Sequence, residues 1–452
     1  MNAWSGQSSK RQVRPTISGT PSTRPVITNL AMVQLLCTVA AILATLPIQL
    51  VTVLEYPIRP TLLALAIILP LVWHTITEKS SNYLSSPFTG LLWLMRWLAI
   101  IIYLLAHLLH TDIQLRATLA FVVTLAFSFF YELGYALVAN KMWQAFLRIH
   151  VLVFSMLCFI LLPIFLYQII KTGYQAGVYL FGTYQIAPYL KTWPNYFSIS
   201  AAIVMGLIVY FGQKNKRYFV LLGVVGPMLW LTEGRAGTIA LVIIFAVWLW
   251  KSRTQNRRFL LGLLIVALVI ANGTIIMKPR FAESVGGRTL ERSYIWRLGA
   301  AQTALETWWQ KYPLLGNGFN SFADLQLEFQ FGRDRTPIAS PHNDYVDLLV
   351  RGGLLYSVAF WGWIILVAFA GLRAKFTDER TTASQLLASF IIGLMATAWV
   401  QNPFKTPEVL LIFWYCAGVI AGFRGSLRPT QIEMDRSPQK PGQGGSIWLK
   451  AL

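Results

Sequence analysis

A series of long apolar stretches constrains this chain more than any other feature. Crossing the hydrocarbon core of a bilayer takes about 20 apolar residues in a helix, and such stretches recur from residue 29 to residue 424. The composition agrees, because 56% of the residues are hydrophobic and only 12% are charged, against roughly 25% charged in soluble domains. We therefore predict an all-α polytopic membrane protein with about 12 transmembrane helices. The predicted spans are 29–54, 60–76, 88–109, 113–138, 146–171, 195–212, 217–233, 236–250, 259–277, 352–372, 384–400 and 408–424.

Basic residues are distributed unevenly between the two sides of this predicted bundle. With both termini inside, the inside segments hold 22 Lys and Arg residues, whereas the short outside connections hold five. Such an asymmetry is what the positive-inside rule requires, and long loops are exempt from that rule. It predicts cytoplasmic N- and C-termini, and it explains the net charge of +20 without a nucleic-acid partner. The five outside residues are Arg59, Lys171, Lys191, Arg235 and Lys405.

The predicted domain organisation has five parts. Residues 1–28 are rich in Pro, Ser, Thr and Arg and lack the apolar core of a secretory signal, so we predict a disordered cytoplasmic tail followed by a first span that retains the protein in the membrane. Residues 29–277 carry nine spans, residues 278–351 form one large outer loop, and residues 352–424 carry three more spans. Residues 425–452 lack apolar periodicity and are predicted to form a second disordered cytoplasmic tail.

The large loop contains one segment with apolar residues at helical spacing. It runs from Thr289 to Gln310, and polar residues alternate with the apolar ones. This periodicity predicts an amphipathic helix, which we expect to lie near the outer membrane–water boundary. The apolar positions are Leu290, Tyr294, Leu298, Ala301, Leu305 and Trp308.

The start of this helix has the character of an anion site. Two glycines precede it, and the first N–H groups of a helix are open to an anion. Arg288 and Arg292 are four residues apart and share one helical face. A guanidinium forks onto two oxygens and stays charged, which suits a diphosphate. Arg288 is therefore the leading anion ligand, and Arg292 and Arg297 are further candidates for binding substrate.

Arg235 is a second candidate for binding an anion. It lies in a connection of almost no length between two apolar runs. A charge so close to the membrane core is costly unless it reaches water, pairs with an opposite charge or binds an anion. An ion pair with Glu233 is the structural alternative.

His342 is the candidate general base. Ser340 and Pro341 form a helix start signal, which places His342 and Asn343 in the first turn of a helix running toward Arg351. A helix N-terminus disfavours positive charge and lowers the pKa of a histidine, and a neutral imidazole can accept a proton. The alternative is a histidine that only caps the helix.

The remaining charged residues in apolar surroundings have structural and functional interpretations. Asp344 and Asp347 are spaced by three residues beside a single histidine, which favours an ion-paired helix face, with Arg351 as partner of Asp347, over a metal site. Arg96, Glu132 and Arg116 lie within predicted spans and must face the protein interior or a wet cavity, where they pair, bind a lipid headgroup or line a transport path. We predict no metal ion and no cofactor, because the sequence lacks a phosphate-binding loop, a zinc motif, a nucleophile elbow and a dense carboxylate cluster.

Three local patterns occur in order along the chain. They are Thr232-Glu233-Gly234-Arg235-Ala236-Gly237; Gly287-Arg288 followed by Ile295-Trp296 and Pro313-Leu314-Leu315-Gly316-Asn317-Gly318; and Ser340-Pro341-His342-Asn343-Asp344-Tyr345 followed by Gly352-Gly353-Leu354-Leu355. With twelve spans and a late outer loop, the chain resembles the O-antigen ligase/O-antigen polymerase superfamily of bacterial envelope glycosyltransferases over roughly residues 190–420.

This resemblance implies an activity and a set of partners. It implies transfer of a glycan from an undecaprenyl-diphosphate-linked donor to a sugar hydroxyl, without metal or nucleotide, at the periplasmic face of the bacterial inner membrane. His342 would deprotonate the hydroxyl, and Arg288 and Arg235 would hold the diphosphate, with Arg292, Asn343 and Arg297 as further contacts to the diphosphate or to the acceptor. The attack would be a single inverting displacement.

The resemblance leaves the acceptor open. One dominant basic outer loop favours the ligase branch, whose acceptor is lipid A–core in lipopolysaccharide assembly. An O-antigen polymerase, whose acceptor is another lipid-linked repeat unit, and a protein O-oligosaccharyltransferase are alternatives with the same chemistry. A membrane transporter is the alternative from another class, although the paired half-repeats expected of one are not visible in the sequence.

Overall fold

The computed structural model describes most of the chain between residues 30 and 425. The described residues are 30–45, 51–53, 56–58, 62–69, 86–110, 115–139, 141–172, 194–231, 235–251, 259–266, 268, 290–318, 328–331, 334–337, 341–375 and 379–425. Both predicted terminal tails lie outside these residues, as do residues 278–289 at the start of the predicted large loop.

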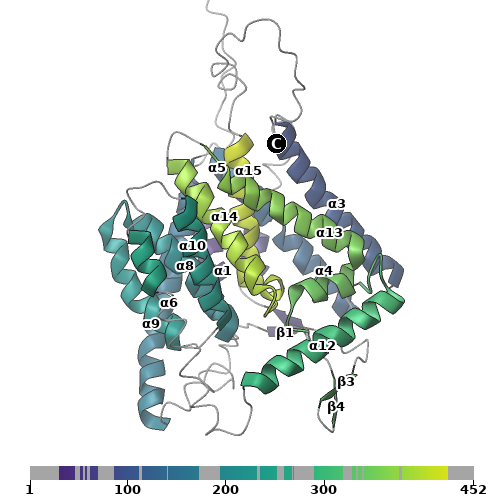
Figure 1. The fold of residues 1–452 in the computed structure, drawn as a ribbon. Helices are drawn as coiled ribbons and strands as arrows, with labels where there is room; N and C mark the ends of the chain where they lie inside the picture. Colours follow the sequence, from purple (N-terminus) through teal and green to yellow (C-terminus); the bar gives the residue numbers. More distant parts are fainter. Residues whose placement is uncertain are drawn as a thin grey trace, which may run out of the picture.

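The described part is helical apart from two short hairpins, as the sequence predicts for a polytopic membrane protein (Figure 1). The hairpins pair β1 with β2 and β3 with β4, both antiparallel. The α-helices are α1 Leu30–Thr45, α3 Pro87–His110, α4 Leu115–Phe127, α5 Phe130–Ala139, α6 Trp143–Thr172, α8 Pro194–Gly212, α9 Leu222–Leu231, α10 Arg235–Lys251, α12 Leu290–Lys311, α13 Asp344–Leu372, α14 Glu379–Thr397 and α15 Pro407–Gly425. The 3-10 helices are η1 Lys216–Leu221 and η3 Pro403–Lys405, and the strands are β1 Val51–Val53, β2 Tyr56–Ile58, β3 Glu328–Phe331 and β4 Asp334–Pro337.

Within the described residues, five helical segments are long and apolar enough to cross a membrane. Helices also lie in the other predicted spans, but over the described residues they are shorter or less apolar. The predicted span 217–233, for example, divides into η1 and the ten-residue α9. The total of about 12 spans remains a prediction. The five segments are Pro87–Leu109, Ala117–Val138, Trp143–Ile164, Asp344–Leu372 and Pro407–Gly425.

Helix α15 lies at the centre of the fold. Every side chain from Val409 to Phe423 is buried, and α15 packs closely against α5. A Cβ atom at Gly418 would come within 1.9 Å of the Tyr131 carbonyl oxygen, and one at Gly134 within 2.4 Å of the Tyr415 carbonyl oxygen. Small residues let membrane helices approach closely and gain van der Waals contact, so these two glycines fix the central helix pair.

The outer faces of α3 and α6 carry large apolar side chains. In a water-soluble protein such contiguous patches would be sticky, whereas on a span they are the surface that meets lipid. Exposure ranges from 47% to 65% at Leu94, Leu98, Ile101, Met156, Phe159 and Ile160. The exposed faces therefore agree with the membrane assignment.

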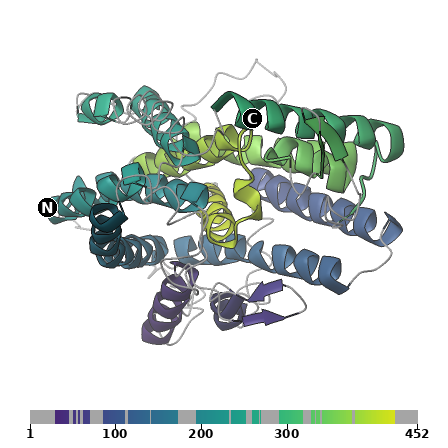
Figure 2. The same ribbon diagram turned by 90° about the horizontal axis from the view of Figure 1, so that it is seen from below.

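Helix α12 confirms the predicted amphipathic helix, and three of its six predicted apolar positions lie at its contact with α13. Ala300 and Ala304 are fully buried against Val346 and Val350 of α13, whereas Leu298, which the periodicity placed on the apolar face, is 56% exposed. The helix turns its small residues toward a neighbouring helix, because small side chains let the two backbones approach. Figures 1 and 2 show α12 beside the beginning of α13, with α3 next to α13 on its other side.

Helix α13 is interrupted at Gly353, where φ is +70° and ψ is −174°. The interruption frees backbone groups on both sides of the break, and the turn after α12 satisfies them. Asn317 N and Gly318 N donate to the carbonyl oxygens of Val350 and Arg351, each at 2.7 Å, while Leu354 N and Leu355 N donate to the carbonyl oxygens of Pro313 and Leu314 at 3.0 and 3.2 Å. The stretches 313–318 and 352–355, both part of the sequence patterns above, therefore form one joint between α12 and α13.

Candidate active site

The structure corrects the predicted start of the helix that carries His342. The helix begins at Asp344, and Asn343 is its N-cap. The Asn343 Oδ1 atom accepts hydrogen bonds from Tyr345 N at 2.9 Å and Val346 N at 3.2 Å, the contacts typical of this cap residue. His342 precedes the helix with a φ of +50°, a left-handed conformation in which histidine is enriched. The expectation that His342 and Asn343 occupy the first helical turn was wrong.

His342 is enclosed by groups from two other parts of the chain. From α12, the Trp296 ring lies 5.7 Å from the imidazole, centroid to centroid. From the connection between α14 and α15, residues 398–406, the Gln401 side chain is hydrogen-bonded to the imidazole. Arg297 also faces His342, and its Nη1 donates to the Val400 carbonyl oxygen at 2.9 Å. The three segments thus meet at the imidazole.

This enclosure makes His342 a weak base that is neutral at physiological pH. The pKa of His342 is lowered from 6.5 to about 4, chiefly by burial and also by the positive charges of Arg297 and Lys405, while the hydrogen bond with Gln401 acts in the opposite direction. A helix N-terminus was the predicted cause of the lowered pKa, whereas the structure points first to burial. The neutral imidazole that general-base chemistry requires is nevertheless present.

The two acidic residues in the first turn of α13 are buried and form polar contacts. Asp347 Oδ2 lies 3.1 Å from Arg351 Nε, which confirms the predicted pair, and Asp347 Oδ1 lies 2.6 Å from Lys405 Nζ. Asp344 Oδ2 accepts a hydrogen bond from Phe404 N at 2.9 Å. The two acidic side chains are therefore paired with basic side chains and a backbone N–H of this protein, as the ion-paired interpretation expects.

Three of the predicted arginines cannot be placed in this site from their side chains. Arg288 lies outside the described residues. Arg292 is in the first turns of α12 and Arg235 is the first residue of α10, but only their backbones are described. Their assignments to the diphosphate stay predictions, whereas Arg297 is placed beside His342.

Sequence reasoning missed the contribution of the α14–α15 connection. Gln401 and Lys405 come from this segment, about sixty residues after His342. Lys405 carried a signal, since a lysine in a short connection between apolar runs raises the same question of a partner as Arg235 does. Gln401 carried none, because a single glutamine has no distinctive spacing.

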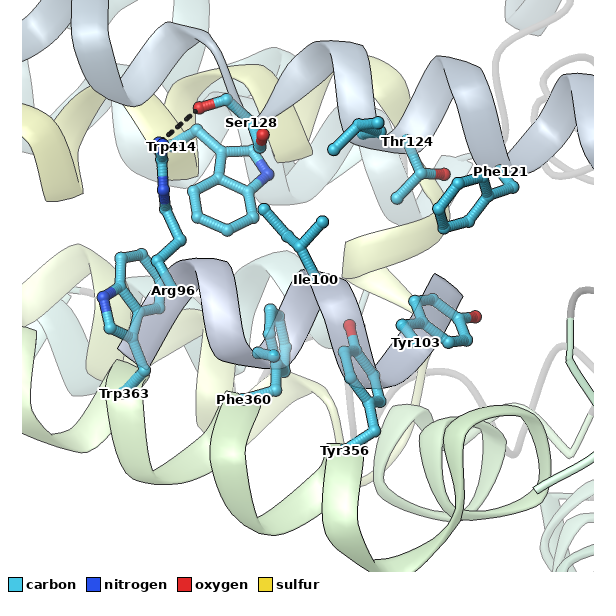
Figure 3. A pocket seen from close by; sticks show the side chains of 12 residues that line it. Arg96, Ile100, Tyr103, Phe121, Thr124, Ser128, Tyr356, Phe360, Trp363 and Trp414 are labelled. Carbon is cyan, nitrogen blue, oxygen red and sulfur yellow. Dashed lines mark hydrogen bonds between the residues drawn. The ribbon is translucent and has the colours of Figure 1, made fainter. Parts of the chain in front are cut away.

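An apolar pocket lies between α3, α4, α13 and α15 (Figure 3). It encloses about 40 Å³, and half of the residues that line it are aromatic. In Figure 3, Ile100 and Tyr103 on α3 face Tyr356 and Phe360 on α13. The Tyr103 side chain is hydrogen-bonded to Arg351, so one end of the pocket adjoins the ion pairs beside His342.

The other end of the pocket contains a buried ion pair. Arg96 and Glu132 are each 1% exposed and form a bidentate contact. Arg96 Nη1 also donates to the Ser128 carbonyl oxygen at 3.1 Å (Figure 3), at the turn that separates α4 from α5. Of the interpretations open for these charges, the structure shows ion pairing; the side chain of Arg116 is not described.

Comparison with known proteins finds a family match over the segment that carries His342. No curated protein matches the sequence. Residues 218–361 match the family model described as O-antigen ligase, a segment that runs from η1 through α12 and His342 into α13. Members of this family are glycosyltransferase-like enzymes that act on glycans in a membrane environment. The match over residues 218–361 confirms the resemblance of this membrane protein to the O-antigen ligase/O-antigen polymerase superfamily.

Proposed function

We propose that this protein is an O-antigen ligase, which transfers a glycan from undecaprenyl diphosphate to a sugar hydroxyl of lipid A–core. The observation that carries the proposal is the position of His342. Within the segment that matches the O-antigen ligase family, its imidazole is neutral and lies between Trp296 and Gln401. A neutral imidazole flanked by cations suits proton abstraction next to an anionic leaving group.

The proposed reaction is a single displacement at the anomeric carbon of the donor glycan. His342 accepts the proton of the acceptor hydroxyl, and the hydroxyl oxygen forms the new glycosidic bond with inversion of configuration. The bond between the anomeric carbon and the diphosphate oxygen breaks, and its electron pair leaves with undecaprenyl diphosphate. Arg288 and Arg235, with Arg292 and Arg297 as further contacts, neutralise the developing charge, a role that preorganised guanidiniums perform well. These cations belong to the protein, so the proposed step invokes no metal.

The apolar pocket offers a place for the beginning of the polyprenyl chain. It adjoins Arg351 through Tyr103, and its lining of Ile100, Phe121 and Tyr356 is apolar and aromatic. An isoprenoid unit gains free energy by leaving water for such a surface. We place the active site on the periplasmic face of the inner membrane, because the distribution of Lys and Arg puts this end of the bundle outside.

The proposed base predicts an unusual dependence of transfer on pH. His342 acts only when neutral, and its pKa of about 4 lies below the ordinary 6.5. As pH falls, kcat/KM should therefore stay constant through pH 6.5 and decline with a midpoint near pH 4, since kcat/KM follows the free enzyme. The measurement is kcat/KM for glycan transfer in detergent between pH 4 and 8, with return to pH 7 to confirm reversibility.

The same profile with Arg297→Gln tests the cause of the shift. Removing that positive charge favours the imidazolium, so the midpoint should move to higher pH. A wild-type midpoint at pH 6.5 would contradict the buried, cation-flanked base.

Substitutions at the ion pair of Arg96 and Glu132 distinguish the transferase hypothesis from the transporter hypothesis. Arg96→Met should destabilise the protein by about 3–5 kcal/mol, because it leaves a buried carboxylate without its partner. Arg96→Met combined with Glu132→Gln should recover much of that loss and retain glycan transfer, as expected of a structural pair. Thermal unfolding in detergent and transfer activity are the measurements. Loss of function in the double variant with stability intact would favour a transport path through these charges.

The proposed activity is tested most simply with purified protein. Incubation with an undecaprenyl-diphosphate-linked glycan and lipid A–core should yield glycosylated lipid A–core and free undecaprenyl diphosphate. Longer lipid-linked glycan would instead indicate a polymerase, and a glycosylated peptide acceptor would indicate a protein O-oligosaccharyltransferase.

A further inference from the structure

We propose that Lys405 is a positioning residue for His342: its ion pair with Asp347 fixes the α14–α15 connection, and Gln401 in that connection orients the imidazole. The inference rests on the proposed function, because it takes His342 to be the base. Lys405 acts at a distance through two contacts and is not assigned to the substrate.

The first contact anchors one end of the connection to α13. Lys405 Nζ lies 2.6 Å from Asp347 Oδ1, and the Asp347 side chain is 3% exposed whereas that of Lys405 is 30% exposed. Asp344 contacts the same connection near both of its ends. Its Oδ2 accepts a hydrogen bond from Phe404 N, and its backbone N donates one to the Ala398 carbonyl oxygen at 2.8 Å. The first turn of α13 therefore fixes residues 398–406 at three points.

The second contact links the other end of the connection to the imidazole. The Gln401 side chain is hydrogen-bonded to His342, and the neighbouring Val400 carbonyl oxygen accepts from Arg297 Nη1. Between Gln401 and Lys405 the chain forms the 3-10 turn η3, with Pro403 at its first position. A turn this short transmits a shift at Lys405 to Gln401.

The fold has a means of tolerating the loss of Lys405. Asp347 keeps Arg351 as a second cation, at 3.1 Å from Oδ2, so its buried carboxylate stays compensated. The charged groups that act on His342 or on its anchor are Asp344, Asp347 and Arg351 on α13, Arg297 on α12, and Lys405 itself. Removing Lys405 should therefore loosen one anchor of the connection without unfolding the protein.

A double-mutant cycle on kcat tests whether Lys405 acts through Gln401. We expect Lys405→Met and Gln401→Ala each to lower kcat by roughly 10- to 100-fold, because a small misplacement of a catalytic group has that effect. The double variant should be no slower than the slower single variant, since coupled residues are not additive. Lys405→Arg should restore most of kcat. Multiplicative losses, or a rise in the KM for the donor in place of a fall in kcat, would overturn the positioning role.

A second measurement does not depend on glycan transfer. Diethyl pyrocarbonate modifies accessible neutral imidazoles, and mass spectrometry of the His342 peptide gives the rate at this residue alone. Lys405→Met should raise the rate several-fold by loosening the connection, while Lys405→Arg should not. Lys214→Met is the matched control, because it removes the Lys214–Glu379 ion pair and should leave the rate unchanged.

The two measurements separate the two proposals. An unchanged modification rate in Lys405→Met overturns the positioning role whatever the enzyme does. A raised rate in a protein whose wild type transfers no lipid-linked glycan supports the structural link and overturns the proposed function.

Discussion

Replacing His342 with alanine should abolish glycan transfer while leaving the protein folded. General-base catalysis contributes roughly 10²- to 10⁴-fold to a rate, and the neutral imidazole of His342 lies between Trp296 of α12 and Gln401 of the α14–α15 connection. The fold should persist because His342 precedes α13 and the cap is made by Asn343. The measurement is transfer from lipid-linked donor by purified protein, normalised to folded protein.

His342→Gln distinguishes a base from an orienting group. A glutamine can hydrogen-bond an acceptor hydroxyl and Gln401, but it cannot take up a proton at neutral pH. We expect this variant to be as inactive as the alanine variant. Transfer close to the wild-type rate in His342→Gln would mean that the residue orients the acceptor and that the base lies elsewhere.

Replacing Gly353 with valine should break the joint between α12 and α13. The backbone at Gly353 has a φ of +70°, and a Cβ atom there would come within 2.1 Å of the Leu314 carbonyl oxygen and 2.5 Å of Gly316 N. With ψ at −174°, this backbone conformation is essentially restricted to glycine and costs about 1–3 kcal/mol in other residues, and displacing the turn loses four backbone hydrogen bonds at about 1 kcal/mol each. The expected destabilisation is roughly 5–7 kcal/mol, measured by unfolding in detergent.

A matched pair of alanine variants isolates the effect of this position. Gly353→Ala should already destabilise the protein strongly, because the clash involves the Cβ atom itself. A Cβ atom at Gly223 in α9 would meet nothing within 4 Å, so Gly223→Ala should be neutral or stabilise by up to about 1 kcal/mol. Equal stability of the two variants would show that the joint does not hold α12 against α13.

The sequence predicted α12 but not the surface that it covers. Periodicity from Leu290 to Trp308 indicates a helix, because apolar residues recur every three to four positions. It cannot say whether the apolar face meets lipid or another helix. Here the fully buried residues are Ala300 and Ala304, which a scale based on hydrophobicity ranks below Leu298. Close packing against α13 favours small side chains, and it accounts for the face of α12 that is buried.

The beginning of α13 shows the limit of local signals. Ser340 and Asn343 are both favoured N-cap residues, and Pro341 made the earlier start more attractive. The structure uses Asn343, and the chain before it is in a left-handed conformation at His342. Choosing between two such caps depends on how Asp344 and Asp347 meet residues 398–406, which lie far away in the sequence.

The groups around His342 are also of two kinds: those that local sequence signals predict, and those that reach the site only through long-range contacts. The sequence predicted the histidine, the nearby Arg297 and the pair of Asp347 with Arg351, because these follow from charge and helical spacing. Gln401 and Lys405 belong to the site only because α14 and α15 return the chain to α13. Such long-range contacts leave no periodic pattern in a single sequence.

The most direct test of the central claim is a gel of envelope polysaccharide, read together with the pool of lipid-linked glycan. Cells lacking this gene should be complemented with wild type or with His342→Ala. The ligase predicts long chains on lipid A–core only with wild type, and accumulation of the same chains on undecaprenyl diphosphate with His342→Ala. Lipid A–core carrying single repeat units would indicate a polymerase. No change in either pool would contradict the account and point to protein glycosylation or transport.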